Sequence, residues 1–155
     1  MCIRDRHRFD SQKYLVDGDK NPILRGFTPQ SNTSSDQNFK PIFLAHARLY
    51  TFADMQLAHP LKQLTLHKLH QTLMGFQLFR SRVGDIIELA RYAYNHNMDR
   101  REDGAVDKLR MLVVLYITRE IEIIGKTKEW EALVEEGGEF VVDFWRACRV
   151  EWISS

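Results

Sequence analysis

Few residues in this chain could do chemistry, and its six histidines are the first to consider. His67 and His70 lie three positions apart, so both can share one side of a predicted helix. A metal site needs further ligands, and this helix supplies no Glu, Asp or Cys at a suitable spacing. We therefore interpret the pair as part of a solvated helix edge beside Lys62 and Lys68. His46 is predicted to be a half-buried residue of the preceding helix.

Other catalytic patterns are missing from the sequence. No Gly-x-Ser-x-Gly nucleophile elbow occurs. Gly125 and the two glycines within residues 135–139 fall at predicted helix ends, not in a phosphate-binding loop. The glutamates of that stretch surround a helix break, which indicates capping and solubility. Cys148 follows Phe144 at helical spacing and indicates packing. We therefore predict a non-enzymatic protein with no catalytic, cofactor-binding or metal-binding residues.

Composition is that of an ordinary globular protein, with 155 residues, 44% hydrophobic and 28% charged. A formal net charge of +1 with interspersed signs predicts no binding to nucleic acid or to a membrane surface. No apolar run is long enough for a membrane span, and no signal peptide is evident. With Cys2 set aside, Cys148 cannot form an internal disulfide, which fits a reducing compartment. We expect an intracellular protein, cytoplasmic or nuclear.

The chain start has an unusual composition. Residues 1–6, Met-Cys-Ile-Arg-Asp-Arg, resemble the translation of a transposon end used in sequencing libraries. We expect a sequencing-adapter artefact here, and we exclude these residues from the fold as one excludes an expression tag. The natural protein would then extend upstream. The alternative is a genuine polar start.

Residues 7–40 are predicted to be irregular. They are rich in Pro, Gly and polar residues, with a run of Gln, Ser, Asn and Thr at 30–38. Such a segment buries too little apolar surface to offset its chain entropy. We expect loose packing here, with a mobile loop over 25–39.

From residue 41 onward the pattern is helical. Apolar residues recur at a period near 3.6, and Pro, Gly, Ser and Thr mark where the helices begin and end. About six helices are predicted, beginning at or near Pro41, Pro60, Ser81, Ala105, Thr127 and Gly138. The fourth should run to Ile124. This predicts an all-α fold, a bundle or a set of stacked helical hairpins. Where the third and fourth helices pack, the buried residues should be Ile86, Ile87, Ala90, Leu109, Val113 and Tyr116.

The order of these segments resembles a known family. Residues 44–54 read Leu-Ala-His-Ala-Arg-Leu-Tyr-Thr-Phe-Ala-Asp, which resembles the helix near the end of BTB (POZ) domains. Residues 61–69 resemble the helix that follows it. Residues 82–94 and 135–140 are similar to later segments of filamentous-fungal BTB proteins. The resemblance covers about residues 41–150.

The resemblance implies a domain organisation. Residues 41–75 would be the end of a BTB domain, and residues 81–150 a BACK-like helical extension. Residues 14–19, Tyr-Leu-Val-Asp-Gly-Asp, are similar to a run that precedes this region in the family, so 7–40 would hold a BTB remnant. The dimer-forming N-terminal part of the BTB domain would be missing.

The resemblance also implies a function. BTB proteins bind other proteins, and some are substrate adaptors for cullin-type ubiquitin ligases. The resemblance therefore implies protein partners, with homodimerisation through the missing BTB part. The alternative from the residues alone is a free-standing helical structural or regulatory domain unrelated to BTB.

The first two predicted helices carry more apolar surface than two solvent-facing helices need. Without the missing BTB core, part of that surface should be exposed on the order of several hundred Å². Aromatic residues are enriched where proteins bind one another, which adds a tryptophan near the C-terminus. The candidate interaction surface consists of Phe43, Leu49, Phe52, Leu57 and Trp152.

Overall fold

The structure, a computed structural model, describes residues 3–15, 27–96 and 105–154, with the side chains of 6–15, 27–96 and 105–149. This part of the chain contains α-helices and connecting segments but no β-strand, which confirms the all-α fold. The elements are α1 (Ile3–Asp10), α2 (Lys40–Met55), α3 (His59–Gly75), the 3-10 turn η3 (Arg80–Arg82), α4 (Val83–His96), α5 (Lys108–Arg119), α6 (Ile121–Ile124), α7 (Lys128–Glu136) and α8 (Glu139–Ser154).

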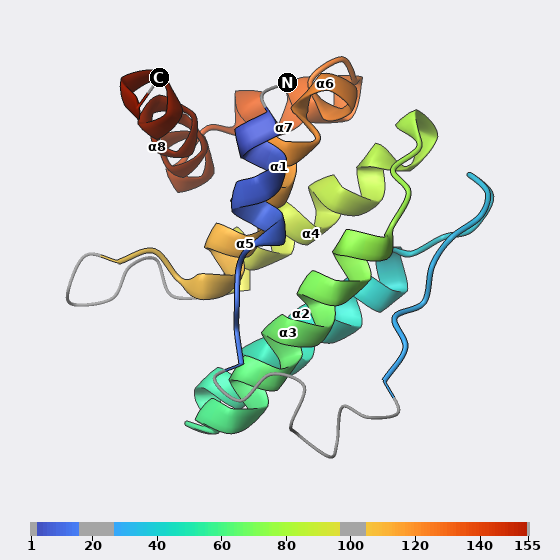
Figure 1. Cartoon of the computed structure of the whole chain (residues 1–155), viewed down its shortest axis with the longest axis vertical. Helices are drawn as coiled ribbons and strands as arrows, with labels where there is room; N and C mark the ends of the chain where they lie inside the picture. The colour runs from blue at the N-terminus through green and yellow to red at the C-terminus, as the bar shows by residue number, and fades with distance from the viewer. Residues whose placement is uncertain (1–2, 16–26, 97–104, 155) are drawn as a thin grey trace.

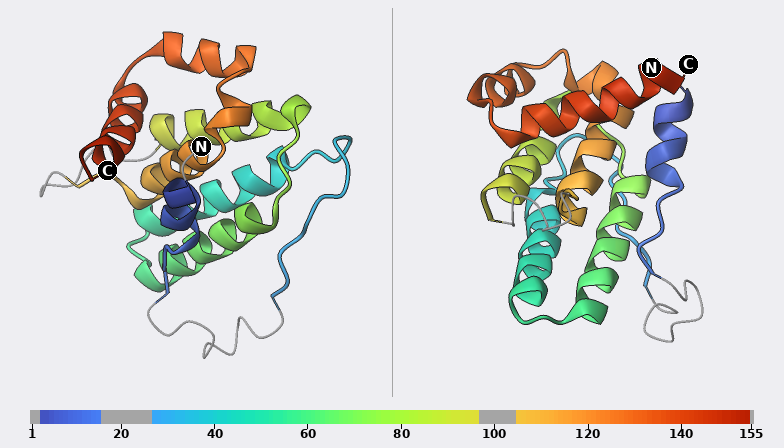
Figure 2. Two further views of the ribbon diagram at one scale, coloured as in Figure 1. Left: turned by 45° about the horizontal axis from the view of Figure 1, so that its top comes forward. Right: turned by 90° about the vertical axis from the view of Figure 1, so that its left-hand side faces the viewer.

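The α2–α3 hairpin lies at one end of the molecule and the C-terminal helices lie at the other, with α4 and α5 between them (Figure 1). At one end α2 and α3 form an antiparallel hairpin, and α2 also packs on α4. Helix α5 contacts α1, α4 and α8. Helices α6, α7 and α8 form the other end, as the right-hand view of Figure 2 shows. The α2–α3 hairpin is therefore well separated from the C-terminal helices.

Several helix boundaries follow from local sequence. Pro41 and Pro60 lie in the first turns of α2 and α3, where a missing N–H costs nothing. The Thr127 hydroxyl accepts a hydrogen bond of 3.3 Å from the Trp130 N–H and caps α7. Gly137 ends α7 with a φ of 68°, a conformation that favours glycine. These predicted boundaries are confirmed.

Two predicted boundaries are wrong. The third helix was expected from Ser81, but η3 occupies that position and α4 begins after it. A single helix was expected over 105–124, whereas α5 starts after Asp107, ends at residue 119, and is followed by the separate α6. The Asp107 carboxylate accepts hydrogen bonds from the N–H groups of Leu109 (3.0 Å) and Arg110 (3.3 Å). This cap fixes the start of α5.

The predicted contact between the third and fourth helices is confirmed by the packing of α4 on α5. All six residues predicted for it are at most 1% exposed: Ile86, Ile87, Ala90, Leu109, Val113 and Tyr116. They belong to one continuous apolar core that also takes in residues of α1, α2, α3, α7 and α8. The core therefore joins both ends of the molecule.

The N-terminal segment differs from the prediction. Residues 3–10 form α1, which packs along α5, although 1–6 were excluded from the fold and 7–40 were expected to be irregular. Phe9 is fully buried, with its ring 4.7 Å from the imidazole of His70 and 5.4 Å from the ring of Tyr116, centroid to centroid. The composition of the segment does not predict this, because α1 is held by contacts with distant residues: the buried Phe9 ring, and the Arg8 guanidinium that donates to the Ala147 carbonyl at 3.0 Å.

The described part of the predicted mobile loop is irregular but anchored. Asn32 is buried, and its side chain donates to the Gln77 carbonyl and accepts from the Gln77 N–H, both at 2.7 Å. Phe39 is buried against Phe43 and Phe76, with ring centroids 6.1 and 5.2 Å away. The expectation of loose packing is therefore wrong at these positions, because paired polar groups and aromatic rings hold the segment.

Candidate interaction surface

Helix α2 has apolar residues on two faces, one of which is buried and the other exposed. Its inner face, with Ala47 and Tyr50 at its centre, is buried against α3 and α4. Its outer face holds exposed apolar residues at helical spacing. We define the α2 surface as these outer residues together with the residue that follows the helix end: Ala45, Arg48, Leu49, Phe52, Met55 and Leu57.

The apolar side chains of this surface are unusually accessible. Leu49 is 42% exposed, Phe52 54%, Met55 74% and Leu57 77%. Single exposed apolar residues are common, but four in one contiguous stretch amount to roughly 300–600 Å², the size of the largest patch on a typical monomer. Such patches mark places where proteins bind one another. Arg48 is the one charged residue of the α2 surface.

Leu57 is held in a conformation that disfavours its side chain. It follows the end of α2 with a φ of 53°, in the left-handed region. Its N–H donates to the Asp54 carbonyl at 3.1 Å, and the Ala58 N–H donates to the Ala53 carbonyl at 2.8 Å. These two bonds define a Schellman motif, whose left-handed residue is usually glycine. A residue with a Cβ costs roughly 1–2 kcal/mol there.

Two of the five predicted surface residues need correction or fall outside the description. Phe43 is fully buried, because it shares the inner face of α2 and its ring packs 5.1 Å from that of Phe76. The side chain of Trp152 lies outside the described residues. Half-exposed Trp145 of α8 takes its place as an accessible tryptophan. Trp145 lies three residues before Cys148, at helical spacing, and apolar periodicity alone does not show which face of a helix a neighbour covers.

Charge is distributed unevenly around the α2 surface. The hairpin, residues 40–75, has four Lys or Arg and one Asp, a formal charge of +3 with neutral histidines. Since the whole chain carries +1, the remaining residues carry −2. The single acid, Asp54, accepts from the Lys62 ammonium at 2.5 Å. The hairpin therefore presents an apolar surface in a weakly positive environment.

A cavity of about 290 Å³ lies beside the hairpin, lined mainly by polar residues of α2, α3 and the start of α5. The Tyr50 hydroxyl donates to Asp107 at 2.7 Å, and the Lys62 ammonium, already bonded to Asp54, lies 5.2 Å from the Tyr50 ring centroid. Burial, and then the Asp107 charge, raise the pKa of Tyr50 above its ordinary value. These four side chains are thus committed to one another, which indicates a structural role.

The clearest polar site that sequence analysis missed surrounds Arg110 of α5. Its guanidinium is buried and donates to the carbonyls of Ala93 (3.3 Å) and Tyr94 (3.1 Å) and to the Glu139 carboxylate (2.7 Å). The Tyr94 hydroxyl donates to Asp143 at 2.7 Å. This network joins the end of α4 to α5 and α8. Its only signal in the sequence is an arginine within an apolar helix stripe.

The histidine predictions have mixed outcomes. His46 is half-buried, as predicted. His70 is buried instead of solvated, with Nε2 2.8 Å from the Phe9 carbonyl, because α1 covers that side of α3. Burial lowers the pKa of His70. In the ranges that the structure describes, no group of three or more His, Cys, Asp or Glu residues could hold a metal ion.

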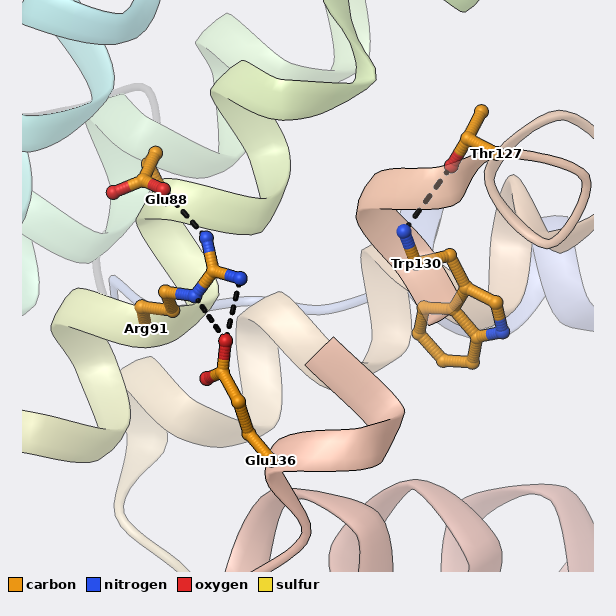
Figure 3. Close-up of polar contacts among 5 residues, drawn as sticks. All are labelled: Glu88, Arg91, Thr127, Trp130 and Glu136. Atoms are coloured by element: carbon orange, nitrogen blue, oxygen red, sulfur yellow. Dashed lines mark hydrogen bonds and ion pairs between the residues drawn. The ribbon is translucent and has the colours of Figure 1, made fainter. Parts of the chain in front are cut away.

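The glutamates at the end of α7 and the start of α8 make specific contacts. Figure 3 shows the Arg91 guanidinium between Glu88 of α4, at 2.6 Å, and Glu136 of α7, at 2.5 and 2.9 Å. The Thr127 cap of α7 is drawn in the same view. For the glutamates within residues 135–139 the sequence predicts capping and solubility. Glu136 instead ties α7 to α4, and Glu139 pairs with Arg110.

Comparisons with known proteins leave the class of this protein open. No family model matches the chain, and neither a curated protein nor a solved structure matches it. The described helices include none with the length and apolarity needed to span a bilayer. The resemblance to fungal BTB proteins therefore stays a prediction, and it enters the proposal below on the residues that suggested it.

Proposed function

We propose that this chain is a non-enzymatic protein-interaction module, part of a BTB-class adaptor or scaffold protein of the cell interior. Residues 41–75 would end the BTB domain, and residues 81–150 would form a BACK-like extension. Its partners would be proteins, and recruitment of substrates to a cullin-type ubiquitin ligase is a role within this class. Neither nucleic acid nor a membrane is part of the proposal.

The observation that carries the proposal is the α2 surface. Four accessible apolar side chains gather there, and one of them, Leu57, occupies a position where glycine would be more stable. Exposed apolar area and local strain both lower the stability of a free monomer. Binding offsets both costs, because the apolar side chains leave water on contact with a partner. Local strain of this kind is concentrated at functional positions.

The alternative function is that of a free-standing helical structural or regulatory domain. The continuous core favours it, because helices from α1 to α8 share one set of buried side chains. A domain with such a core can fold without a further layer. Under this alternative, the α2 surface would have no partner.

The coding sequence upstream of residue 7 separates the BTB proposal from this alternative. The proposal predicts an in-frame BTB strand–helix core that continues directly into this chain. A stop codon followed by a short, unrelated start would contradict it. This experiment tests the class of protein only, and binding through the α2 surface requires a separate test.

Binding through the α2 surface can be tested with matched variants of the full chain. Phe52→Asp places a charge in the centre of the surface, and Val134→Asp places one on a comparably exposed apolar residue of α7. Affinity capture should recover a set of proteins with wild type and Val134→Asp that is lost with Phe52→Asp. Equal recovery with all three, with circular dichroism confirming that each is folded, would contradict binding through this surface.

A further inference from the structure

Helix α1 is held on the rest of the molecule by contacts of three consecutive residues. It lies along α5 at the edge of the molecule, as the right-hand view of Figure 2 shows. Among the α1 side chains that the structure describes, only that of Phe9 is buried. The Arg8 guanidinium donates to the Ala147 carbonyl at 3.0 Å, and the Asp10 carboxylate lies 3.3 Å from Nε of Arg119. All three residues follow position 6, so these contacts do not involve the stretch interpreted as a sequencing artefact.

The place that receives Phe9 combines aromatic rings with polar groups. The Phe9 ring packs against the rings of His70 and Tyr116, and the guanidinium carbon of Arg119 lies 5.4 Å from its centroid. Nε2 of His70 donates to the Phe9 carbonyl at 2.8 Å. We define the α1 docking site as the residues of α3, α5 and α8 that make these contacts with α1: His70, Tyr116, Arg119 and Ala147.

The polar groups of this contact are incompletely paired. In the part of the chain that the structure describes, the buried side-chain atoms without a hydrogen-bond partner in the protein are Oδ1 of Asp10, the Tyr116 hydroxyl and Nε of Arg119. All three belong to α1 or to the stretch of α5 beneath it. Asp10 and Arg119 form an ion pair, but not in hydrogen-bonding geometry. Because buried polar groups without partners are costly, these atoms oppose the docking of α1.

Helix α1 also has little stability of its own. It has eight residues, and isolated helices shorter than about 12–15 residues are marginal in water. Burial of the Phe9 ring favours the docked state by roughly ten- to a hundredfold, whereas the ordering of the chain opposes it. A segment held by so few contacts opens without the rest of the molecule. We expect an open population on the order of 1%.

We propose that α1 is a releasable strap that blocks a binding site on its own chain. The ligand of the α1 docking site is a short segment of a partner protein in which a phenylalanine is followed by an acidic residue. Its phenyl ring takes the place of Phe9, and its carboxylate pairs with Arg119. This site is separate from the α2 surface, so it goes beyond the function proposed above.

The Tyr116 hydroxyl shows how a partner can displace α1. Tyr116 is 1% exposed, and α1 gives its hydroxyl no acceptor. A partner segment whose carboxylate accepts from this hydroxyl and also pairs with Arg119 satisfies a group that α1 leaves unsatisfied. A hydrogen bond to a charged acceptor is stronger than one between neutral groups. Such a segment therefore binds the docking site more tightly than the α1 sequence does.

Competition within the chain sets the affinity that a separate ligand would show. With an open fraction of about 1%, the apparent dissociation constant is about a hundredfold above the intrinsic one. A tethered segment has an effective concentration on the order of 1 mM. Occupancy of about 99% by α1 then corresponds to an intrinsic dissociation constant of about 10 μM for the same sequence as a free peptide.

Peptide binding to the full chain provides the main test. The probe is a fluorescein-labelled peptide of residues 7–15. The receptors are wild type, Phe9→Ala, which empties the docking site, and the matched control Phe52→Ala, which removes an exposed phenyl ring of α2. Fluorescence anisotropy should give a dissociation constant about a hundredfold lower for Phe9→Ala than for the other two. Equal affinities for all three, or no binding to a folded Phe9→Ala chain, would overturn the proposal.

Variants of the peptide test the chemistry of the ligand against the Phe9→Ala chain. Phe9→Ala in the peptide should abolish binding, and Asp10→Ala should weaken it several-fold because the pair with Arg119 is lost. Lys13→Ala is the control, since Lys13 is exposed, and should leave the affinity unchanged. If the Phe9→Ala peptide bound as well as the original, the docking site would not be the receptor. An unchanged affinity for Asp10→Ala would overturn the acidic part of the ligand.

Hydrogen exchange on wild type measures the opening itself. The hydrogen-bonded amides of α1 should exchange at least about a hundredfold faster than those of α5, at a rate that low concentrations of urea barely change, because a local opening exposes little surface. The open fraction obtained in this way should agree with the ratio of the two dissociation constants. Equal exchange of α1 and α5 would make α1 part of the cooperative core and contradict the strap.

Asp10→Lys provides a second variant, which keeps the buried ring. It places an ammonium beside the Arg119 guanidinium, so it should open α1 and lower the dissociation constant of the peptide several-fold relative to wild type. Circular dichroism checks that the other helices remain. If Phe9→Ala or Asp10→Lys lost the helical structure of the whole chain, α1 would be indispensable to the fold, and the proposal would be wrong.

These outcomes are distinct from those of the proposed function. Phe52→Asp, which removes partners of the α2 surface, should leave the affinity for the peptide unchanged. Peptide binding that persists when the capture experiment fails would keep the α1 docking site and remove the function of the α2 surface. Capture that depends on Phe52, without peptide binding to Phe9→Ala, would give the opposite result.

Discussion

Leu57 combines a high exposure with an unfavourable backbone conformation. At the left-handed position of a Schellman motif, a Cβ crowds the following carbonyl, and glycine avoids this. Because the side chain is mostly in solvent, little packing in the monomer compensates for the strain. The residue is thus better suited to a bound state than to the free monomer.

Replacement of Leu57 by glycine should therefore stabilise the monomer. We expect the free energy of unfolding to rise by about 1 kcal/mol, with the relief of strain partly offset by the greater freedom of glycine in the unfolded chain. Urea unfolding measures this. Leu57→Ala is the control, because it keeps the Cβ and should give no such gain.

Few side chains could replace Arg110 and still donate to the three acceptors around it. Its buried guanidinium lies against the C-terminal end of α4 and donates to two carbonyls of that helix and to the Glu139 carboxylate. A lysine ammonium is compact and cannot present the planar fork that reaches all three. At least one carbonyl would lose its partner in the interior, where an unsatisfied acceptor is costly.

We expect Arg110→Lys to lower the free energy of unfolding by about 2–4 kcal/mol, although the charge is kept. Part of that loss comes from the Glu139 pair, which contributes less than a fully buried pair since Glu139 is 43% exposed. Chemical unfolding checks the magnitude. Glu139→Gln should cost much less, and an equal cost would assign the effect to the ion pair alone.

At the scale of elements, the sequence predicts where helices begin better than it predicts which of their faces are buried. Pro41, Pro60 and Thr127 act through the backbone within one turn, so the starts they mark are visible without any tertiary information. The apolar period of α4 is equally local. The orientation of Phe43, however, depends on which face of an almost wholly apolar helix is covered. No local pattern contains that information.

The burial of His70 and the packing of α1 were missed for the same reason. Phe9 and His70 are 61 residues apart and meet only in the folded chain. Around Phe9 the sequence is charged, and an average over such a segment predicts no packing. For the candidate surface, Leu49, Phe52 and Leu57 could be predicted as exposed from an excess of apolar residues. The strained backbone at Leu57 could not.

The contact of α4 with α5 should behave as an ordinary close-packed interior. Ile87 and Leu109 are both fully buried there. Truncation of either to alanine should lower the free energy of unfolding by roughly 2–5 kcal/mol, from lost burial and from the cavity left behind. Urea unfolding of each variant measures this, and losses near zero in both would contradict the packing described.

The contact between Phe9 of α1 and His70 of α3 predicts a dependence of stability on pH. Burial lowers the pKa of His70 most, and the charges of His67 and Arg119 act in the same direction, whereas the Phe9 carbonyl and Asp10 raise it. In the unfolded chain His70 keeps its ordinary pKa of 6.5. The unfolded state thus binds more protons, and the free energy of unfolding falls as the pH drops below 6.5.

We expect this fall to reach at most about 1.4 kcal/mol per pH unit from His70. His70→Gln can still donate to the Phe9 carbonyl but does not titrate, so its stability should fall less between pH 7.5 and 5.5. Burial raises the pKa of Glu120, which has the opposite effect on stability, but that contribution is common to both proteins. The difference between their urea-unfolding curves isolates His70, and parallel curves would contradict its buried neutral state.

At the scale of the whole molecule, charge is divided between the α2–α3 hairpin, at +3, and the remaining residues, at −2.

The position of Phe9 has a consequence for how the chain is made. On the ribosome Phe9 is added before His70 and Tyr116, the residues whose rings contact it in the folded chain. At 5–20 residues per second, the delay is on the order of ten seconds. The α2–α3 hairpin, whose contacts are local, can form within that time, whereas α1 must wait with its phenyl ring accessible to chaperones and proteases.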